Sequence, residues 1–258
     1  KVSHLVEGFF EENLSLQTEA VEKEDKDYEN GLEIVLTDVT GFLGQHLLSH
    51  LLAFKKVRRV HCIAVQPESD GLNNASSHPP GRHLKARKYS GDLTLPLLGL
   101  SPKGFQKLAL STDIIIHNGA DTSFLKVYNS RKPANVLSTK TLAQLALLAC
   151  QLQRGKNVPV HSISTASVAA FALKQHSQDV VFPVSLAPYP PCEPDAAVKD
   201  GYAASKWVGE VMLERLAWSP QLSGCGMEVV IHRPVSLYTV EGTAKALAGY
   251  LTQRTGKE

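Results

Sequence analysis

Two residues that can move a proton, Tyr202 and Lys206, stand four positions apart in the stretch GYAASK. On a helix, this spacing places both side chains on one face. A lysine ammonium beside a phenol favours the phenolate, so we expect Lys206 to lower the pKa of Tyr202 and to make it a proton donor or acceptor near neutral pH. The same spacing is also common in ordinary pairs on a helix surface.

Two hydroxyl side chains, Ser164 and Thr165, close the stretch HSIST upstream of this pair. Beside the tyrosine, such hydroxyls would hydrogen-bond the carbonyl of a substrate. Short hydroxyl side chains are equally typical of turns at strand ends, which is the structural alternative.

A glycine-containing turn, LTDVTGFLG (36–44), lies near the start of the globular sequence. A loop that holds a pyrophosphate has the pattern Gly-x-x-Gly-x-x-Gly, because small residues let the backbone approach and the free N–H groups of the next helix stabilise the charge. Gly41 and Gly44 fit the pattern, but Asp38 stands at the first position. Alone, the turn is a weak signal, since glycine also serves tight turns that bind nothing.

The elements around these residues alternate between strands and helices. Apolar, β-branched runs predict strands at 32–37, 58–65, 113–120, 158–165 and 227–234, and apolar residues at helical spacing predict helices at 42–54, 134–152 and 200–218. Such alternation is typical of a parallel sheet covered on both faces. We therefore predict an α/β fold, a Rossmann-like doubly wound parallel sheet. Residues 66–90 and 182–194 are expected to be long surface loops, which often border active sites.

The composition of the 258 residues is that of an ordinary globular protein, with 43% hydrophobic and 20% charged residues. A net charge of +2 gives no strong field of one sign, which argues against a nucleic-acid partner. No run approaches the ~20 apolar residues of a membrane helix. The four cysteines are far apart in sequence, so we expect no metal site and no disulfide framework, but idle thiols in a reducing, cytoplasmic location.

The first part of the chain differs in character from the rest. Residues 11–30 are dominated by Glu, Asp and Lys and contain little to bury, whereas the first strand pattern follows Gly31. We therefore expect residues 1–30 to form a linker or lead-in, and residues 31–258 to form the folded domain.

Together and in this order, the turn, the hydroxyl-bearing strand and the Tyr–Lys helix are far more specific than any one of them. The chain resembles the extended short-chain dehydrogenase/reductase (SDR) superfamily. More narrowly, it resembles the thioester reductase (R or R*) domains that end nonribosomal peptide synthetases and fungal polyketide synthase hybrids. The stretches that carry the resemblance run from about residue 32 to 238: LTDVTGFLGQHLL, VHCIAV, GDLTLPLLGLS, IIIHNGADTSF, ANVLSTKTL, HSISTASV, GYAASKWVGEVMLERL and VIHRPVSL.

The resemblance implies a role for each matching residue. Thr165 and Tyr202 would hold and polarise a thioester carbonyl, and Lys206 would bind the nicotinamide ribose and tune the tyrosine. Asn135 would support the site from its helix. The residues that would line an NADP(H) site, from the phosphate turn through the adenine and ribose contacts to the loop over the nicotinamide, are Thr37, Gly41, Phe42, Leu43, Gly44, Asp92, Leu93, Asn118, Gly119, Ala120, Lys206 and Pro234.

Two departures from the family pattern concern the cofactor. Asp38 crowds the approach to the pyrophosphate and adds a like charge, and Gln66 stands where relatives carry an arginine for the 2′-phosphate of NADPH. Losing one such charge contact costs about 1.5–3 kcal/mol. Basic residues nearby are alternative phosphate partners: Arg82, Lys85, Arg87 and Lys88.

Only residues 235–258 follow Pro234, so the C-terminal substrate subdomain of the family is expected to be short or missing.

Two release chemistries follow from the resemblance, both on an acyl chain held as a thioester by a phosphopantetheinyl carrier domain upstream in the same megasynthase. One is NADPH-dependent reduction to an aldehyde or alcohol. The other is redox-inactive Dieckmann cyclisation to a tetramic acid, which needs no cofactor and whose base is not identified. The intact triad and the altered turn favour Dieckmann cyclisation. An inactive scaffold that docks the carrier stays a third alternative, while the absence of a G-x-S-x-G elbow argues against a serine hydrolase.

Overall fold

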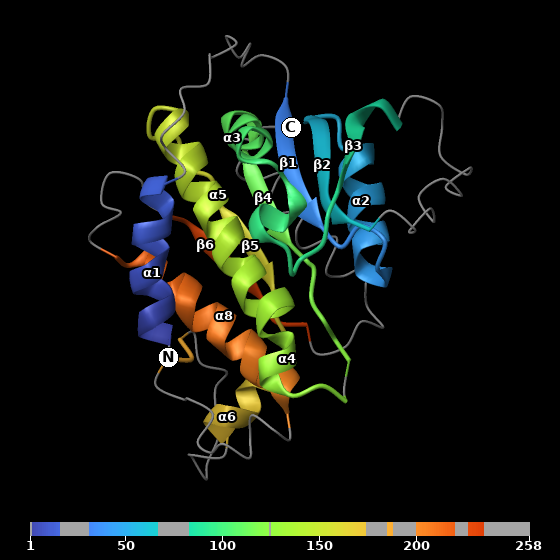
Figure 1. The fold of residues 1–258 in the computed structure, drawn as a ribbon. Helices are drawn as coiled ribbons and strands as arrows, with labels where there is room; N and C mark the ends of the chain where they lie inside the picture. Colours follow the sequence, from blue (N-terminus) through green and yellow to red (C-terminus); the bar gives the residue numbers. More distant parts are fainter. Residues whose placement is uncertain are drawn as a thin grey trace.

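The core of the protein is a six-stranded parallel sheet with the strand order β3-β2-β1-β4-β5-β6 (Figure 1). The computed structural model describes residues 2–15, 31–66, 83–123, 125–173, 185–187, 200–219 and 227–234. The strands are β1 (Leu32–Thr37), β2 (Val57–Val65), β3 (Ala86–Ser90), β4 (Ile114–His117), β5 (Val160–Ile163) and β6 (Val229–His232). This is the predicted Rossmann-like α/β fold, and the strand order reverses between β1 and β4.

Helices cover both faces of the sheet. On one face α2 (Phe42–Ala53) packs its leucines against β1 and β2, and on the other face lie α1 (Val2–Ser15), α3 (Pro102–Ser111), α5 (Ser138–Leu152) and α8 (Gly201–Ala217) (Figure 1). Short helical segments connect these elements: η3 (His83–Lys85), η4 (Pro96–Gly99), α4 (Tyr128–Lys132), η5 (Pro133–Leu137), η6 (Ala166–Val168) and α6 (Ala169–Leu173). Every residue of β4 and β5 is buried, as two covered faces require.

Three elements differ from the sequence-based expectation. Helix α1 lies within the segment expected to be a lead-in, yet Phe9 is fully buried in the core beneath α5 and α8, so this helix packs on the domain. Residues 16–30 lie outside the described residues. Edge strand β3 lies within residues 66–90, so the prediction of a surface loop is wrong at its C-terminal end, where Arg87 and Lys88 leave the strand without apolar alternation. Helix α3 was also not predicted, because Gly104 interrupts its pattern.

The cysteines also correct one expectation. Cys62 is a buried free thiol, whereas Cys150 is disulfide-bonded, so idle thiols are the wrong description at that position. Among the described residues, no group of His, Cys, Asp and Glu side chains is arranged to hold a metal ion. None of the helices described has the length and apolar character that crossing a bilayer requires.

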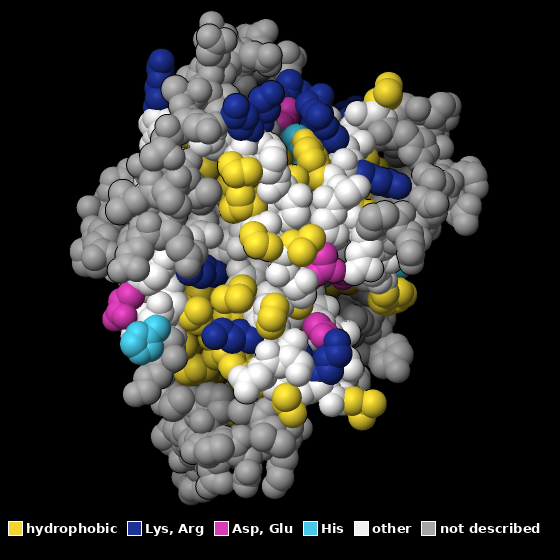
Figure 2. Space-filling model, viewed as in Figure 1, with side chains coloured by type: hydrophobic (Ala, Val, Ile, Leu, Met, Phe, Trp, Pro, Cys, Tyr) yellow, Lys and Arg dark blue, Asp and Glu magenta, His cyan; other side chains and the backbone are white. Residues whose placement is uncertain are grey.

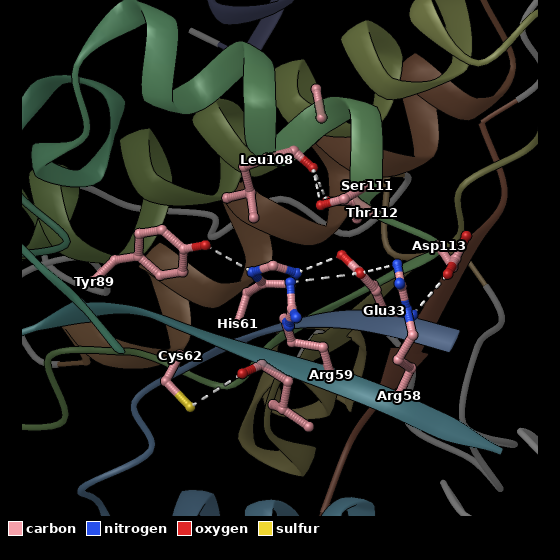
Figure 3. A network of polar contacts seen from close by, with 12 residues as sticks. Glu33, Arg58, Arg59, His61, Cys62, Tyr89, Leu108, Ser111, Thr112 and Asp113 are labelled. Atoms are coloured by element: carbon pink, nitrogen blue, oxygen red, sulfur yellow. Dashed lines mark hydrogen bonds and ion pairs between the residues drawn. The ribbon is translucent and has the colours of Figure 1, made fainter. Parts of the chain in front are cut away.

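A buried polar network joins β1, β2 and β3 with Asp113, the residue before β4 (Figure 3). Glu33 accepts hydrogen bonds from His61 at 2.8 Å and from Arg58, and its own backbone N–H donates to Asp113 at 2.6 Å. His61 also contacts the Tyr89 hydroxyl at 2.9 Å. Burial alone would raise the pKa of Glu33, but the hydrogen bond and charge of His61 hold it at about 2.

Glu33, Arg58 and Asp113 of this network lie at the edge of the sheet where β1, β2 and β4 begin. Figure 2 shows Lys and Arg side chains gathered at the top of the view, the end from which β1 enters the sheet in Figure 1. The residues with predicted chemical roles lie at the opposite edge, where the strands end.

Candidate active site

The centre of the site is the gap between the ends of β1 and β4, where the strand order reverses. Ligands of open α/β sheets bind at such a point. The Thr37 hydroxyl at the end of β1 accepts the backbone N–H groups of Asn118 at 3.0 Å and Gly119 at 2.8 Å. It also contacts Nδ1 of His117 at 3.2 Å. Burial, followed by the charge of Lys206, lowers the pKa of His117 to about 3, so this imidazole is neutral.

The glycine turn brings the start of α2 close to the end of β1. A Cβ atom on Gly44 would lie 1.7 Å from the backbone oxygen of Asp38, so only glycine fits there. A Cβ atom on Gly41 would lie 2.4 Å from Oδ2 of Asp38. Phe42, the first residue of α2, is exposed, whereas Leu43 packs into the core between α2 and the sheet.

The carboxylate of Asp38 lies inside this turn. Asp38 has φ of 58°, a left-handed conformation that a first-position glycine would adopt without strain. Its Oδ2 accepts Nδ2 of Asn118 at 3.0 Å, and the Gly41 backbone also hydrogen-bonds to the side chain. Burial raises the pKa of Asp38 to about 6, against this hydrogen bond and the charge of Lys206. Two residues expected to hold a cofactor, Gly41 and Asn118, are thus in contact with a protein carboxylate.

The predicted adenine side of the site is also internally paired. Gln66, just after β2, donates from Nε2 to Oδ2 of Asp92 at 2.7 Å. Hydrogen bonds from Thr94, followed by that of Gln66, lower the pKa of Asp92. Leu93 packs so closely on Gly119 that a Cβ atom there would lie 2.7 Å from Cδ1 of the leucine. Ala120, the next residue, is partly exposed.

The basic residues considered as alternative phosphate partners are only partly described. Lys85 points Nζ toward the Phe54 carbonyl at 3.4 Å, and Arg87 lies over the Tyr89 ring at 5.3 Å. Lys88 is exposed on β3, the edge strand. Arg82 lies outside the described residues.

The predicted triad lies at the ends of β5 and β6. Lys206 on α8 donates from Nζ to the Ile163 carbonyl at 2.7 Å, and the same nitrogen is 6.0 Å from the centre of the Tyr202 ring. Thr165 caps η6, where its hydroxyl accepts the Ser167 backbone N–H at 3.2 Å. The neighbouring Ala166 N–H donates to the carbonyl of Pro234 at 3.1 Å, which brings that residue to the triad.

The electrostatics of the Tyr–Lys pair differ from expectation. Burial lowers the pKa of Lys206 to about 8, against the attraction of Glu210 and Asp38. Burial likewise raises the pKa of Tyr202, and the charge of Asp200 adds to this, while Arg131 acts in the opposite direction. The pKa of Tyr202 is therefore raised and not lowered as predicted, because desolvation outweighs the charge of Arg131.

A support for the site comes from an irregular helix. Asn135 lies in η5, a π-helical turn between α4 and α5, and such turns are frequent at functional sites. Its side chain accepts the Asp121 N–H at 2.6 Å and donates to the Ser205 hydroxyl at 2.9 Å. Asn135 thus links the loop after β4 to α8, the helix that carries the triad tyrosine and lysine.

Arg131 is a residue that the sequence reasoning missed. Its guanidinium lies 5.8 Å from the centre of the Tyr202 ring, and the whole residue is 1% exposed. The available signal was its position four residues before Asn135, because that spacing puts both on one helical face. Gly201 allows this contact, since a Cβ atom there would lie 2.5 Å from the backbone nitrogen of Tyr128 at the start of α4.

The arrangement brings the three residues predicted to be catalytic to the same edge of the sheet as the altered glycine turn. Thr165 follows β5, Lys206 donates to the Ile163 carbonyl at the end of β5, and Tyr202 lies at the start of α8 with its ring 6.0 Å from Nζ of Lys206. The glycine turn at the end of β1 has the geometry of a phosphate-binding loop, but the Asp38 carboxylate lies inside it.

Comparison with known proteins gives consistent matches. The family model NAD_binding_4, described as male sterility protein, matches residues 36–254. The hybrid PKS-NRPS synthetase gkaA of Penicillium citrinum is 42% identical over 213 residues, which are 83% of this chain and 5% of that protein. Fusarin C synthetase of Gibberella fujikuroi is 41% identical over 208 residues, 81% of this chain and 5% of the synthetase. The chain thus spans about a twentieth of the length of these relatives.

Solved structures with the same fold include reductase domains. The terminal R domain of the myxalamid PKS-NRPS pathway has 30% identity and a TM-score of 0.57, and the match covers 87% of this chain and 56% of that one. The reductase domain of a nonribosomal peptide synthetase from Mycobacterium tuberculosis has 25% identity and a TM-score of 0.60, with 90% and 54% covered.

Proposed function

Because the chain belongs to the NAD_binding_4 (male sterility protein) family and has the extended SDR fold of terminal R domains, we propose that it is a chain-release enzyme acting on an acyl thioester. Its relatives are fungal PKS-NRPS hybrid synthetases. The proposed partner is therefore a phosphopantetheinyl carrier domain of the same megasynthase. The proposed substrate is a polyketide–aminoacyl chain bound to that carrier.

The favoured reaction is redox-inactive Dieckmann cyclisation to a tetramic acid. The observation that carries this choice is the position of the Asp38 carboxylate, which bonds Asn118 and lies against Gly41. A pyrophosphate would have to displace this carboxylate or lie beside it, and both bear negative charge. The pairing of Gln66 with Asp92 supports the same choice, because an amide cannot form the charge-assisted bond that a 2′-phosphate requires.

Cyclisation needs a different set of groups from reduction. The carbon between the two carbonyls of the β-ketoacyl amide loses a proton and attacks the thioester carbonyl, so that a C–C bond forms. The C–S bond then breaks and the carrier leaves as its thiol. Thr165 and Tyr202 are the proposed donors to the oxyanion that develops on the thioester oxygen. No hydride is transferred in this sequence.

Reductive release is the second candidate. It is favoured by the intact Tyr202–Lys206 pair, since a lysine of this kind in the superfamily binds the nicotinamide ribose. For this candidate Thr37, Gly44, Asn118 and Lys206 would hold NADP(H), which would supply a hydride to the thioester carbonyl. The geometry of the glycine turn fits a nucleotide, because Gly44 lets the start of α2 approach β1, but the Asp38 carboxylate does not fit the pyrophosphate.

One pair of measurements separates the two candidates. The purified protein is titrated with NADPH while nicotinamide fluorescence is followed, and it is then incubated with a β-ketoacyl-aminoacyl thioester of N-acetylcysteamine. The proposal expects a tetramic acid to form without NADPH and expects no micromolar binding of the nucleotide. Micromolar binding together with NADPH consumption on the thioester would establish reduction instead.

Replacing Tyr202 tests the third alternative, an inactive scaffold that only docks the carrier. Tyr202→Phe removes one hydroxyl from a half-buried residue of α8, so the fold should persist. A release enzyme loses activity in this variant, whereas a scaffold that only docks a carrier shows unchanged product release by the synthetase.

A further inference from the structure

One ion pair joins helix α8 to the residue that follows strand β6. Arg233 donates from Nη2 to Oε2 of Glu210 at 2.7 Å and from Nε to the same oxygen at 3.0 Å, and Nε also approaches Oε1 at 3.3 Å. The side chain of Glu210 is 3% exposed and that of Arg233 is 15% exposed. Because the guanidinium is a rigid fork, these bonds fix the orientation of both side chains as well as their separation.

The backbone on either side of the arginine holds the predicted catalytic threonine. His232, the residue before the arginine, accepts the Ser164 N–H at 2.7 Å, and Pro234, the residue after it, accepts the Ala166 N–H at 3.1 Å. Thr165 lies between these two donors. The position of its hydroxyl therefore depends on where the end of β6 is held.

Glu210 lies on the helix that carries the other two predicted catalytic residues. It follows Lys206 by four positions, or about one helical turn, so both side chains leave α8 on the same face. Nζ of Lys206 donates to the Ile163 carbonyl at 2.7 Å, two residues before Thr165. Two successive turns of α8 are thus bonded to the ends of β5 and β6, which are themselves paired in the sheet.

The ion pair is not needed to hold α8 against the core. Apolar side chains of this helix already do so, among them the fully buried Val211, Met212 and Leu216. Replacing a buried ion pair by apolar residues is often neutral or stabilising, so stability alone gives no reason for one at this place. A fixed orientation between α8 and the end of β6 does give a reason, because apolar packing is not directional.

We propose that the Glu210–Arg233 pair is a clamp that sets the position of the Thr165 hydroxyl relative to Tyr202 and Lys206. Glu210 and Arg233 are positioning residues, because they act through α8 and through the backbone around Thr165. Two hydroxyls from different elements can hold one oxyanion only if those elements keep their relative position, and a misplacement of about 1 Å can cost about a hundredfold in rate. The inference rests on the proposed function for the use of these hydroxyls, but the clamp is measurable without turnover.

The first test is amide hydrogen exchange, which needs no substrate. The N–H groups of Ser164 and Ala166 exchange when their bonds to the end of β6 open. Glu210→Gln keeps the side-chain volume and removes the charge. We expect it to raise the exchange rate at Ala166 at least about tenfold, because a hydrogen bond between charged groups is worth more than one tenfold step in an equilibrium constant. An unchanged rate at both amides overturns the proposal.

Glu33→Gln is the matched control. Glu33 is also a buried carboxylate paired with an arginine, but it lies at the opposite edge of the sheet. Its replacement should leave exchange at Ser164 and Ala166 unchanged. Equal increases in Glu33→Gln and Glu210→Gln would mean that the Glu210 pair contributes only to global stability, which overturns the proposal.

Substitution of the arginine tests the clamp from its other side. Glu210 also acts on Lys206 through its charge, and Arg233→Met leaves that charge in place. A clamp requires Arg233→Met to raise exchange at Ala166 as Glu210→Gln does, whereas a purely electrostatic role of Glu210 predicts no change. If either variant does not fold, Arg233→Lys decides. It keeps the charge but lacks the fork, so a smaller increase at Ala166 is expected and an unchanged rate contradicts the clamp.

Activity adds an independent readout. With the N-acetylcysteamine thioester as model substrate, Glu210→Gln should lower kcat about tenfold with KM little changed. In a Thr165→Val background the same substitution should lower the residual kcat less than about twofold, because no hydroxyl is left to misplace. Equal losses in the two backgrounds overturn the proposal. If the parent protein forms neither a tetramic acid nor an aldehyde, the proposed function fails, while hydrogen exchange still decides the role of the clamp.

Discussion

Replacing Asp38 by glycine should turn the altered turn into a nucleotide site. The carboxyl has a pKa of about 6, so its ionised form exceeds the protonated form about tenfold at pH 7 and about a hundredfold at pH 8. If only the protonated form admits a pyrophosphate, the Kd for NADPH rises about tenfold for each pH unit above 6, or about 1.4 kcal/mol per unit. Asp38→Gly should therefore bind NADPH about 10- to 100-fold more tightly at pH 8.

The assay is nicotinamide fluorescence titrated from pH 6 to pH 8. NADH is measured in parallel, because the 2′-phosphate of NADPH itself has a pKa near 6 and would otherwise mimic the carboxyl. Asp38→Asn is the matched control, since it keeps the side-chain volume, tolerates the left-handed φ and removes only the charge. Asp38→Asn should remove the pH dependence of nucleotide binding, but it should gain less affinity than Asp38→Gly because it keeps the side-chain volume.

The reasoning is refuted if the unaltered protein binds NADH equally well at pH 6 and pH 8, or if neither variant gains affinity. Cyclisation of the model thioester gives a second result from the same proteins. Retained cyclisation in Asp38→Gly means that the carboxylate only obstructs the cofactor, and lost cyclisation identifies Asp38 as a candidate for the missing base.

Further predictions address the rest of the site and the fold. Adding Gln66→Arg to the glycine variant should improve binding of NADPH about tenfold but not that of NADH, which fluorescence titration checks. Tyr202→Phe should lower kcat for product release about 10²- to 10⁴-fold with an unchanged unfolding curve. Gly201→Ala should destabilise the protein by about 1–3 kcal/mol in urea, because the new Cβ atom would lie 2.5 Å from backbone, whereas Gly209→Ala, with its nearest contact at 3.6 Å, should stabilise it slightly. Because the pKa of Glu33 is about 2 in the fold and 4.5 when unperturbed, stability on the order of 3 kcal/mol is present above pH 4.5 and is lost as the pH falls toward 2. Glu33→Gln should remove this acid dependence in urea unfolding.

Most strands of the sheet could be predicted from the sequence because each has a recognisable local pattern. The runs that became β1, β2, β4, β5 and β6 are apolar and β-branched, as strands covered on both faces must be. Strand β3 could not be found in this way. Its Arg87 and Lys88 are exposed, and its strand conformation comes from pairing with β2, which is a tertiary property. The same holds for α1, where buried Phe9 is visible only in the packed structure.

The candidate site, like the sheet, could be predicted from the sequence only in part. Residue types and spacing identified Asp38 as the unusual position in the turn, but they could not show that its carboxylate bonds Asn118, eighty positions away. Spacing also paired Tyr202 with Lys206, yet the effect of burial on both pKa values depends on how α4 and α8 enclose them. The assignment of Thr165, Tyr202 and Lys206 as catalytic stays a prediction.

The Glu33 network has a consequence for how such a domain can change over time. Glu33 and Asp38 are five residues apart on and after one strand, about 16 Å along the sheet, and the two groups share no contact in the described residues. Substitutions that far apart usually add independently. Substitutions at position 38 that change the nucleotide turn are therefore expected to leave the contribution of the Glu33 network to stability unchanged. An engineer can treat the two ends of the sheet as separate design problems.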